Sequence, residues 1–219
     1  MKKIELVAPV SNSRMLRAAI EFGADAVYFG GKNFNARLYA NNFSEREIKE
    51  SIDAAHLQGI KVYITVNTLI KDSELDELLK FLKFVYECGA DALIITDFAV
   101  LSIIKQNFPD IDIHGSTQMG VHNVQAVQFL QNKGLKRIIL SRELTSNEIT
   151  EIKKKTDVEL EVFAHGALSY FFSGQCYFSS LVGGRSGNRG RCAQPCRLKY
   201  SLSDVEGRKY IKKSKRGFV

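Results

Sequence analysis

Seven short apolar segments alternate with amphipathic segments over the first 168 residues of this 219-residue chain. The apolar segments are rich in Val, Ile and Tyr, which is typical of parallel strands that are buried on both faces. Their starts are about 20–35 residues apart, the length of one βα unit. This repeat predicts an α/β protein with a parallel sheet. The predicted strands are residues 4–9, 26–31, 61–67, 92–97, 111–117, 137–144 and 160–168.

Two of the intervening segments have clear helix boundaries. Residues 44–59 begin with Ser44 and Glu47 at the spacing of a capping box and end at Gly59. Residues 73–89 show the same helical period and also end at a glycine. We therefore expect an amphipathic helix in each segment.

A doubly wound sheet and a (β/α)₈ barrel are both built from such units. The first predicted strand is followed by APVSNSR rather than by the GxGxxG turn of a dinucleotide-binding fold. Seven consecutive units with short loops favour the barrel, but no eighth strand is recognisable after Leu168. We predict an incomplete TIM-like (β/α) barrel core over residues 1–168, followed by a Cys/Arg-rich loop.

That loop is expected to occupy residues 169–200, and a basic tail is expected at 201–219. The chain finishes with KKSKRGFV, which has no helix-capping pattern. We interpret the tail as the start of a truncated further segment.

Polar side chains follow the predicted strands, at the ends where barrels of this kind gather their function. Asp97 and Ser116 are placed to cap the next helical segment. Arg142 and His165 are the candidates for binding a ligand, in particular an anion. The complete set is Ser11, Asn33, Asn35, Asn67, Thr68, Thr96, Asp97, Ser116, Thr117, Gln118, Ser141, Arg142, Glu143 and His165.

The net charge of +7 is unevenly distributed along the chain. Residues 183–219 carry eleven Lys or Arg and two acids, whereas the other 182 residues carry 20 bases and 22 acids. Such a concentration is typical either of a solvated tail or of a surface that meets phosphate groups. Arg185, Arg189 and Arg191 are the candidates for phosphate contacts.

Three of the four cysteines, Cys176, Cys192 and Cys196, lie within 21 residues of one another. The chain shows no secretory signal and no apolar run long enough to span a membrane, so we expect it to be cytoplasmic. In that compartment a cysteine cluster favours metal or redox chemistry over disulfides. The spacing C-x15-C-x3-C is not that of a zinc ribbon, and three free cysteines are the alternative.

The segment from Glu161 to Arg197 resembles the signature of the collagenase-like peptidase U-32 family. That signature has Glu-x-Phe, then Gly, a small residue, an aliphatic residue and Cys, then Gly-x-Cys and Ser. The segments ELVAPV, ADAVYFGG and GGRSGNRGRCAQPCR are also similar to family members, so the resemblance covers residues 1–200. The matching signature residues are Glu161, Phe163, Gly166, Ala167, Leu168, Gly174, Cys176 and Ser179.

The resemblance implies one of several activities. Family members are named as peptidases, or act as oxygen-independent hydroxylases on RNA pyrimidines or on a quinone precursor. The hydroxylases imply a [4Fe–4S] cluster with four cysteine ligands, of which Cys176 and Cys192 match two. Ser169 stands where the family has its first signature cysteine, and the fourth would fall beyond Val219. Cys196 is the remaining candidate ligand.

We expect hydroxylation of a tRNA or rRNA pyrimidine, because arginines beside a cofactor loop would bring an RNA backbone to it. Tyr170, Phe171 and Phe172 are expected to be buried under the loop, the alternative being that they stack a splayed base. A peptidase is the second hypothesis, although no Ser-His-Asp or HExxH pattern is recognisable. A third is an inactive partner subunit of a paralogue, bound through the exposed sheet edge.

Overall fold

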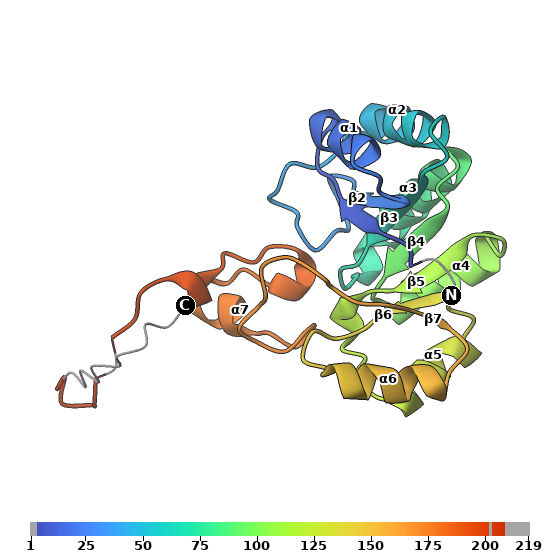
Figure 1. Cartoon of the computed structure of the whole chain (residues 1–219). Coiled ribbons are helices and arrows are strands. Elements are labelled where there is room, and N and C mark those ends of the chain that lie inside the picture. Colours follow the sequence, from blue (N-terminus) through green and yellow to red (C-terminus); the bar gives the residue numbers. More distant parts are fainter. Residues whose placement is uncertain (1–3, 202, 209–219) are drawn as a thin grey trace.

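The computed structural model describes residues 4–201 and 203–208. Seven parallel strands form one curled sheet in chain order, with β1 and β7 at its edges (Figure 1). All seven predicted strand positions are confirmed, and within the described residues no strand joins β7 to β1. The barrel is therefore incomplete, as predicted. The strands are β1 (Val7–Pro9), β2 (Ala26–Gly30), β3 (Lys61–Val66), β4 (Ala92–Ile95), β5 (Asp112–Gly115), β6 (Arg137–Ile139) and β7 (Glu159–Glu161).

The last strand is shorter than the sequence predicts. The pattern predicts a strand from 160 to 168, but β7 ends at Glu161 and the chain then leaves the sheet. The side chains of Val162 and Phe163, which prolong the apolar pattern, are about half exposed. Their apolarity reflects a surface outside the barrel rather than a longer strand.

The helices that connect consecutive strands lie on the convex side of the sheet, and one further helix follows the last strand (Figure 1). The capping box predicted at Ser44 and Glu47 is confirmed, since the Ser44 amide donates to the Glu47 carboxylate at 2.8 Å. The helices are α1 (Ser13–Glu21), α2 (Glu45–His56), α3 (Leu75–Glu87), α4 (Phe98–Asn107), α5 (Val124–Asn132), α6 (Ser146–Lys154) and α7 (Phe178–Gly183). Short 3₁₀ turns are η1 (Asp72–Glu74), η2 (Thr117–Met119), η3 (Gly187–Arg189) and η4 (Pro195–Arg197).

Alternation along the strands divides the buried residues into two groups. Residues such as Val62 and Ile64 belong to a large apolar cluster shared with the helices. Their neighbours Tyr63, Ile94 and Ile139 form a smaller cluster on the concave inner face of the sheet, with no helical residue in it. The inner face is thus only partly apolar, and its remaining positions are charged or polar.

A charged network occupies the inner face near the amino ends of the strands. The buried guanidinium of Arg137 in β6 donates to Glu5 at 2.7 Å, to Glu159 at 2.7 Å and to Glu161 at 3.4 Å. The Tyr63 hydroxyl also donates to Glu5, at 2.6 Å. Burial raises the pKa of the Glu161 carboxyl. Because Glu5 precedes β1, this network links the first strand to the last two across the open side of the sheet.

The described part of the chain contains no helix that is both long enough and apolar enough to cross a lipid bilayer.

Candidate functional site

Residues 162–200, here called the signature lobe, follow β7 and are docked over the loops at the carboxyl ends of the strands. The amide of Leu38, after β2, donates to the Gly190 carbonyl at 3.0 Å, and the Leu69 amide, after β3, donates to the Asn188 carbonyl at 3.2 Å. Glu143, after β6, accepts from the Ser173 amide at 2.8 Å. Figure 1 shows the lobe, with α7, extending to one side of the barrel from this end. The lobe therefore lies where barrel proteins place their active sites.

Arg189 holds the lobe to the barrel. Its guanidinium forms a bidentate pair with Glu74, with distances of 2.5 and 2.8 Å, and also donates to the Leu69 carbonyl at 2.8 Å. The hydrogen bonds from Arg189 lower the pKa of the Glu74 carboxyl to about 2. The side chain that the sequence made a candidate for phosphate binding is thus engaged in a contact within the protein.

Two glycines of the lobe sit where a side chain would collide with the barrel loops. Gly174 and Gly190 both have positive φ angles, 72° and 74°. A Cβ on Gly174 would overlap the Gln118 carbonyl oxygen, and one on Gly190 would overlap the carbonyl oxygen of Asn35. Close backbone contact with the barrel explains why these two positions are glycine.

Ser179 joins the two halves of the lobe. It lies in α7, is 2% exposed, and its Oγ accepts a hydrogen bond from the Ala193 amide at 3.0 Å. This contact holds α7 against the segment that carries Cys192 and Cys196. The signature serine therefore has a structural role in positioning the cysteine-bearing segment.

The three clustered cysteines all belong to the lobe, but they do not form a ligand set. Cys176 and Cys196 are half-buried, Cys192 is exposed, and none is in a disulfide. Among the described residues, no three His, Cys, Asp or Glu side chains come together as a metal site. A [4Fe–4S] cluster takes four thiolate ligands, so the residues that the structure describes do not fit that group.

Arg142 links the barrel to the position where the family signature has its first cysteine. Its Nη2 atom donates to the Ser169 hydroxyl at 3.1 Å, and its guanidinium lies 5.7 Å from the centre of the Phe163 ring. Arg142 thus contacts two residues of the lobe, and its expected role in binding a ligand stays a prediction. His165 is exposed in the loop between Phe163 and Ser169.

The three consecutive aromatic residues of the lobe are exposed, so the expectation that they are buried is wrong. The exposed fractions are 58% for Tyr170, 41% for Phe171 and 71% for Phe172. Phe171 packs on the ring of Phe178, with ring centres 5.3 Å apart, and still remains partly exposed. These side chains are therefore accessible to a ligand.

The remaining predicted phosphate-binding arginines, Arg185 and Arg191, follow α7 in the chain. Arg185 stacks over the Tyr39 ring at 4.6 Å and donates to the Arg191 carbonyl at 3.2 Å. The Arg191 residue is exposed. Because no described carboxylate pairs with either guanidinium, both are available to an anion.

The mouth of the half-barrel is lined with hydroxyl and amide groups. Asp97 caps α4 through the Ala99 amide at 2.7 Å, and Ser116 caps η2 through the Gln118 amide at 3.2 Å, which confirms the predicted caps. Among the described residues, the buried hydroxyls of Thr96 and Ser141 have no hydrogen-bond partner. A cavity of about 300 Å³ opens beside Thr96 and Asp97. This edge of the sheet can hold a small polar molecule.

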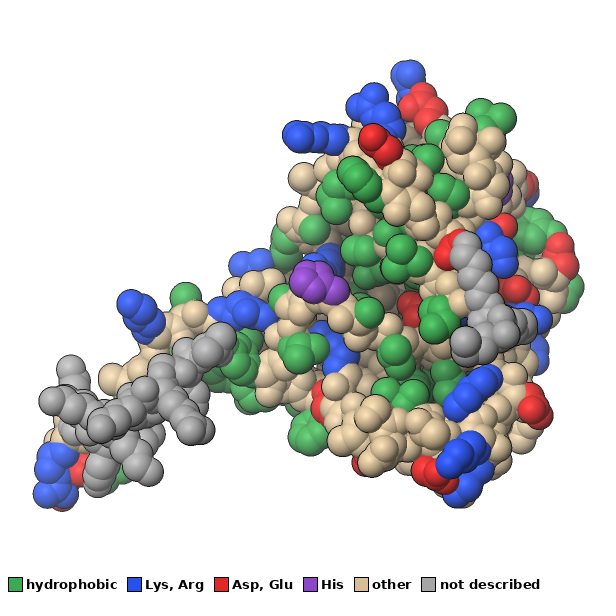
Figure 2. All heavy atoms as spheres, in the orientation of Figure 1, with side chains coloured by type: hydrophobic (Ala, Val, Ile, Leu, Met, Phe, Trp, Pro, Cys, Tyr) green, Lys and Arg blue, Asp and Glu red, His purple; other side chains and the backbone are tan. Residues whose placement is uncertain are grey.

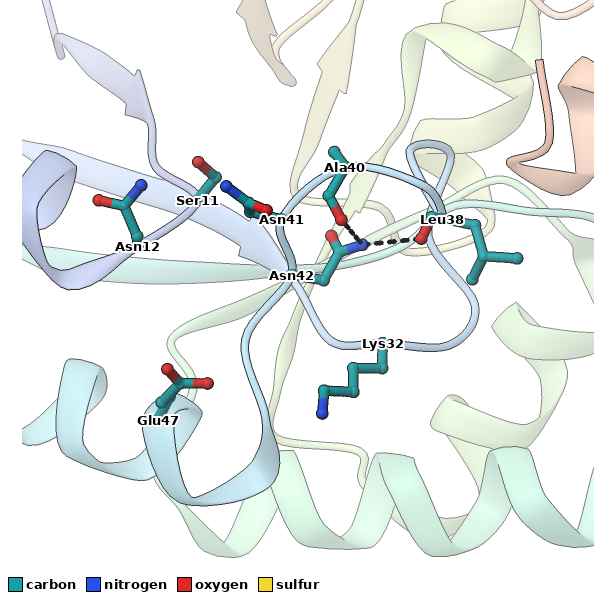
Figure 3. Close-up of a pocket in the computed structure, with 8 residues that line it drawn as sticks. All are labelled: Ser11, Asn12, Lys32, Leu38, Ala40, Asn41, Asn42 and Glu47. Carbon is teal, nitrogen blue, oxygen red and sulfur yellow. Dashed lines mark hydrogen bonds between the residues drawn. The ribbon is translucent and has the colours of Figure 1, made fainter. Parts of the chain in front are cut away.

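A second, open pocket of about 540 Å³ lies between the loops that follow β1 and β2 (Figure 3). The side-chain amide of Asn42 donates to the carbonyls of Leu38 and Ala40, at 3.1 and 3.0 Å, and these hydrogen bonds fix the shape of the loop. Glu47 is held by the Ser44 cap. Lys32 is the cation at this pocket. Its lining residues are Ser11, Asn12, Lys32, Leu38, Ala40, Asn41, Asn42 and Glu47.

The Arg137 network and the pair between Arg189 and Glu74 are not predicted by the sequence pattern. One signal was present, because Arg137 and Glu161 are charges inside otherwise apolar strand segments. An inward-facing charge in a barrel strand requires partners on neighbouring strands. The partners themselves depend on strand register, which the sequence pattern does not specify.

The chain is thus a parallel α/β half-barrel with a glycine-, arginine- and cysteine-rich lobe docked at the carboxyl ends of its strands. A family model described as Peptidase family U32 matches residues 11–218. The chain belongs to this family. The solved U32 peptidase Mk0906 is similar in fold, with a TM-score of 0.66 and 17% identity, covering 77% of this chain and 71% of that one.

Curated relatives carry two kinds of name. The chain is 42% identical to the 23S rRNA 5-hydroxycytidine C2501 synthase of Escherichia coli, over 94% of this chain and 31% of that protein. It is 38% identical to tRNA hydroxylation protein P1 of Bacillus subtilis, over 94% and 49%. It is 35% identical to a collagenase of Porphyromonas gingivalis, over 92% and 51%. The chain thus spans between about a third and a half of the length of these relatives.

Proposed function

We propose that this chain forms part of an enzyme that hydroxylates a pyrimidine in tRNA or rRNA. Relatives named for RNA hydroxylation match 94% of the chain at 38–42% identity. The observation that carries the proposal is the charge of the signature lobe. Residues 162–203 contain no Asp or Glu, and Arg185, Arg191 and Arg197 of this segment are exposed. Such a surface favours a polyanion over a peptide.

Hydroxylation at a pyrimidine carbon breaks a C–H bond, forms a C–O bond and removes two electrons from the base. The reaction therefore needs an oxidising co-substrate that supplies the oxygen atom and takes up the two electrons. In our proposal Arg185 and Arg191 hold the RNA backbone, and the cavity beside Thr96 receives a small co-substrate. The buried Thr96 hydroxyl, which has no hydrogen-bond partner among the described residues, would gain one there, which removes the cost of burying it unpaired. Arg189 acts in this scheme as an anchor of the lobe.

The family resemblance implies a [4Fe–4S] cluster at Cys176 and Cys192. Because the described residues do not supply a four-thiolate site, we assign no step to such a cluster. Iron and sulfide analysis of protein purified without oxygen, with Cys176→Ala beside it, tests it directly. Iron and sulfide that are lost in the variant would add the cluster to the mechanism.

A peptidase is the second candidate, and the relative named collagenase supports it. A hydrolytic triad would need a serine or cysteine beside a histidine. Among the described residues, His56 pairs with Asp91 and His122 contacts the Gly120 carbonyl, whereas no serine or cysteine side chain is hydrogen-bonded to a histidine. The geometry therefore favours RNA modification.

The proposal is tested by comparing RNA nucleosides from a strain that lacks the gene with those of its parent. We expect one hydroxylated pyrimidine nucleoside to disappear, as measured by mass spectrometry, and to return when the gene is restored. The purified chain should leave casein and gelatin intact. An unchanged nucleoside profile, together with proteolysis by the pure protein, would overturn the proposal and establish the peptidase.

A further inference from the structure

We infer that the exposed aromatic rings of the signature lobe form a stacking surface for unpaired RNA bases. This inference rests on the proposed function and names how the substrate is recognised. Six aromatic side chains of the lobe are more than 40% exposed, although a folded protein ordinarily buries most of such rings. They are Phe163 (46%), Tyr170 (58%), Phe171 (41%), Phe172 (71%), Tyr177 (67%) and Tyr200 (63%).

Direct contacts connect several of these rings into one surface. Arg197 lies 5.6 Å from the centre of the Tyr170 ring and donates to the Leu168 carbonyl at 2.9 Å. Phe178 lies 5.3 Å from Phe171 and 6.1 Å from Tyr200, measured between ring centres. Exposed rings that lie this close together favour a binding surface over scattered surface residues.

Arginines stack on two of these rings, and a third arginine of the lobe stacks on a ring of the loop after β2. Arg142 stacks on Phe163, Arg197 on Tyr170, and Arg185 on Tyr39. No described carboxylate forms an ion pair with these three guanidinium groups. In Figure 2, Lys/Arg and hydrophobic side chains lie close together along the part of the lobe that is in view.

Exposed aromatic rings together with arginines favour single-stranded nucleic acid over a duplex or a protein as the ligand of this surface. Each base has a π-face that stacks on an aromatic ring whatever its sequence, while arginines track the phosphates. A paired base in an A-form helix cannot lie flat on an exposed ring. A protein partner would be expected to meet both signs of charge at the rim, whereas the segment from 162 to 203 has only bases.

The test measures binding of a fluorescent single-stranded pyrimidine-rich RNA to the full chain, with the same sequence as a duplex in parallel. We expect Tyr170→Ala with Phe172→Ala to weaken single-strand binding at least about tenfold, since each stacked base contributes about 5- to 150-fold. Both side chains are exposed, so thermal unfolding should be unchanged. Phe22→Ala, at an 80% exposed ring on the barrel, is the matched control and should bind normally.

The salt dependence of RNA affinity distinguishes the contribution of the arginines from that of the aromatic rings. Arg185→Gln with Arg191→Gln should lower the slope of log affinity against log salt by about 1.4 for a single strand, whereas the aromatic variant should keep the wild-type slope. Arg14→Gln with Arg17→Gln, two exposed arginines of the first helix, is the control and should leave the slope unchanged. An RNA carrying 2-aminopurine should change its fluorescence on binding the wild type but not the aromatic variant.

The inference is overturned if the aromatic variant binds single strands like the wild type, or if duplex and single strand bind equally. Binding of the lobe to anionic phospholipid vesicles in place of RNA, lost in the same variant, would assign the surface to membranes and overturn it as well. Its failure is distinct from failure of the proposed function, which is read from nucleosides in cells. Suppose that the aromatic variant binds RNA like the wild type, while the gene deletion still lacks the nucleoside. The stacking surface would then be wrong, and the proposed function would still hold.

Discussion

Arg137 in β6 lies 2.7 Å from Glu5, a residue 132 positions earlier that precedes β1. This ion pair spans the inner face of a sheet whose two edge strands are not joined among the described residues. A complete barrel would close this gap with an eighth strand. Here a charged network, with Glu159 and Glu161 as further partners, ties the first strand to the last two.

Arg137→Met should destabilise the chain by about 3–5 kcal/mol at neutral pH, because it leaves three carboxylates close together without their cation. Urea unfolding followed by circular dichroism measures this loss. Arg46→Met, which breaks an exposed pair with Glu50, is the control and should leave the free energy of unfolding unchanged. Equal effects of the two substitutions would show that the network does not stabilise the half-barrel.

His114 gives the stability a defined pH dependence. Burial lowers its pKa from the ordinary 6.5 to about 3, and its ring packs edge-on against Tyr63 with centres 4.6 Å apart. Below pH 6.5 the unfolded chain binds a proton that the folded chain does not, so acid should destabilise the fold by up to about 1.4 kcal/mol per pH unit down to pH 3. His114→Phe should reduce this dependence. An NMR titration of His114 near pH 6.5 in the folded protein would contradict the prediction.

Glu74→Gln should loosen the signature lobe. It removes the carboxylate that pairs with Arg189, a charged contact that stabilises by about 1.5–3 kcal/mol. Trypsin should then cleave faster after Arg185 and Arg191. Because the pKa of Glu74 is lowered from 4.5 to about 2, its contribution is complete above pH 4.5 and disappears as the pH falls towards 2. The wild-type lobe should therefore loosen in that window, which an acid-active protease can detect.

Glu87→Gln is the control for the trypsin experiment, since Glu87 faces only an exposed Lys83 at 3.7 Å. Its cleavage pattern should match the wild type. Unchanged cleavage in Glu74→Gln would show that the pair does not hold the lobe.

Gly174→Ala and Gly184→Ala separate backbone strain from steric overlap. Both glycines have positive φ angles, 72° and 65°, so each alanine carries the same conformational cost of about 1–2 kcal/mol. Only the Cβ at position 174 meets the barrel, at the Gln118 carbonyl, whereas that at 184 meets nothing within 4 Å. Gly174→Ala should therefore lower the melting temperature more, and equal shifts would contradict the close packing of lobe and barrel.

The seven strands could be predicted because each buried segment is continuous and its neighbours have a clear helical period. The end of β7 could not, since the apolar pattern of residues 160–168 continues into exposed lobe residues such as Phe163. The same ambiguity led to the wrong prediction for Tyr170 and Phe172. Apolarity predicts burial, but whether a partner surface exists depends on tertiary packing.

The contacts of the candidate site could not be predicted from the sequence. The lobe that carries the arginines and cysteines is docked on the loops after β2, β3 and β6. That Arg189 anchors the lobe to Glu74, while Arg185 stacks on Tyr39, depends on how loops more than 100 residues apart meet. No spacing rule contains that information.

The most direct test of the account is the hydroxylated pyrimidine content of RNA from a strain that lacks the gene and is complemented with variants of it. We predict that the wild-type gene and the Arg14→Gln, Arg17→Gln control restore the missing nucleoside in full. Arg185→Gln with Arg191→Gln, expressed at the same level, should restore clearly less. Full restoration by the lobe variant would contradict RNA binding through these arginines, and a deletion strain with no missing nucleoside would contradict RNA modification itself.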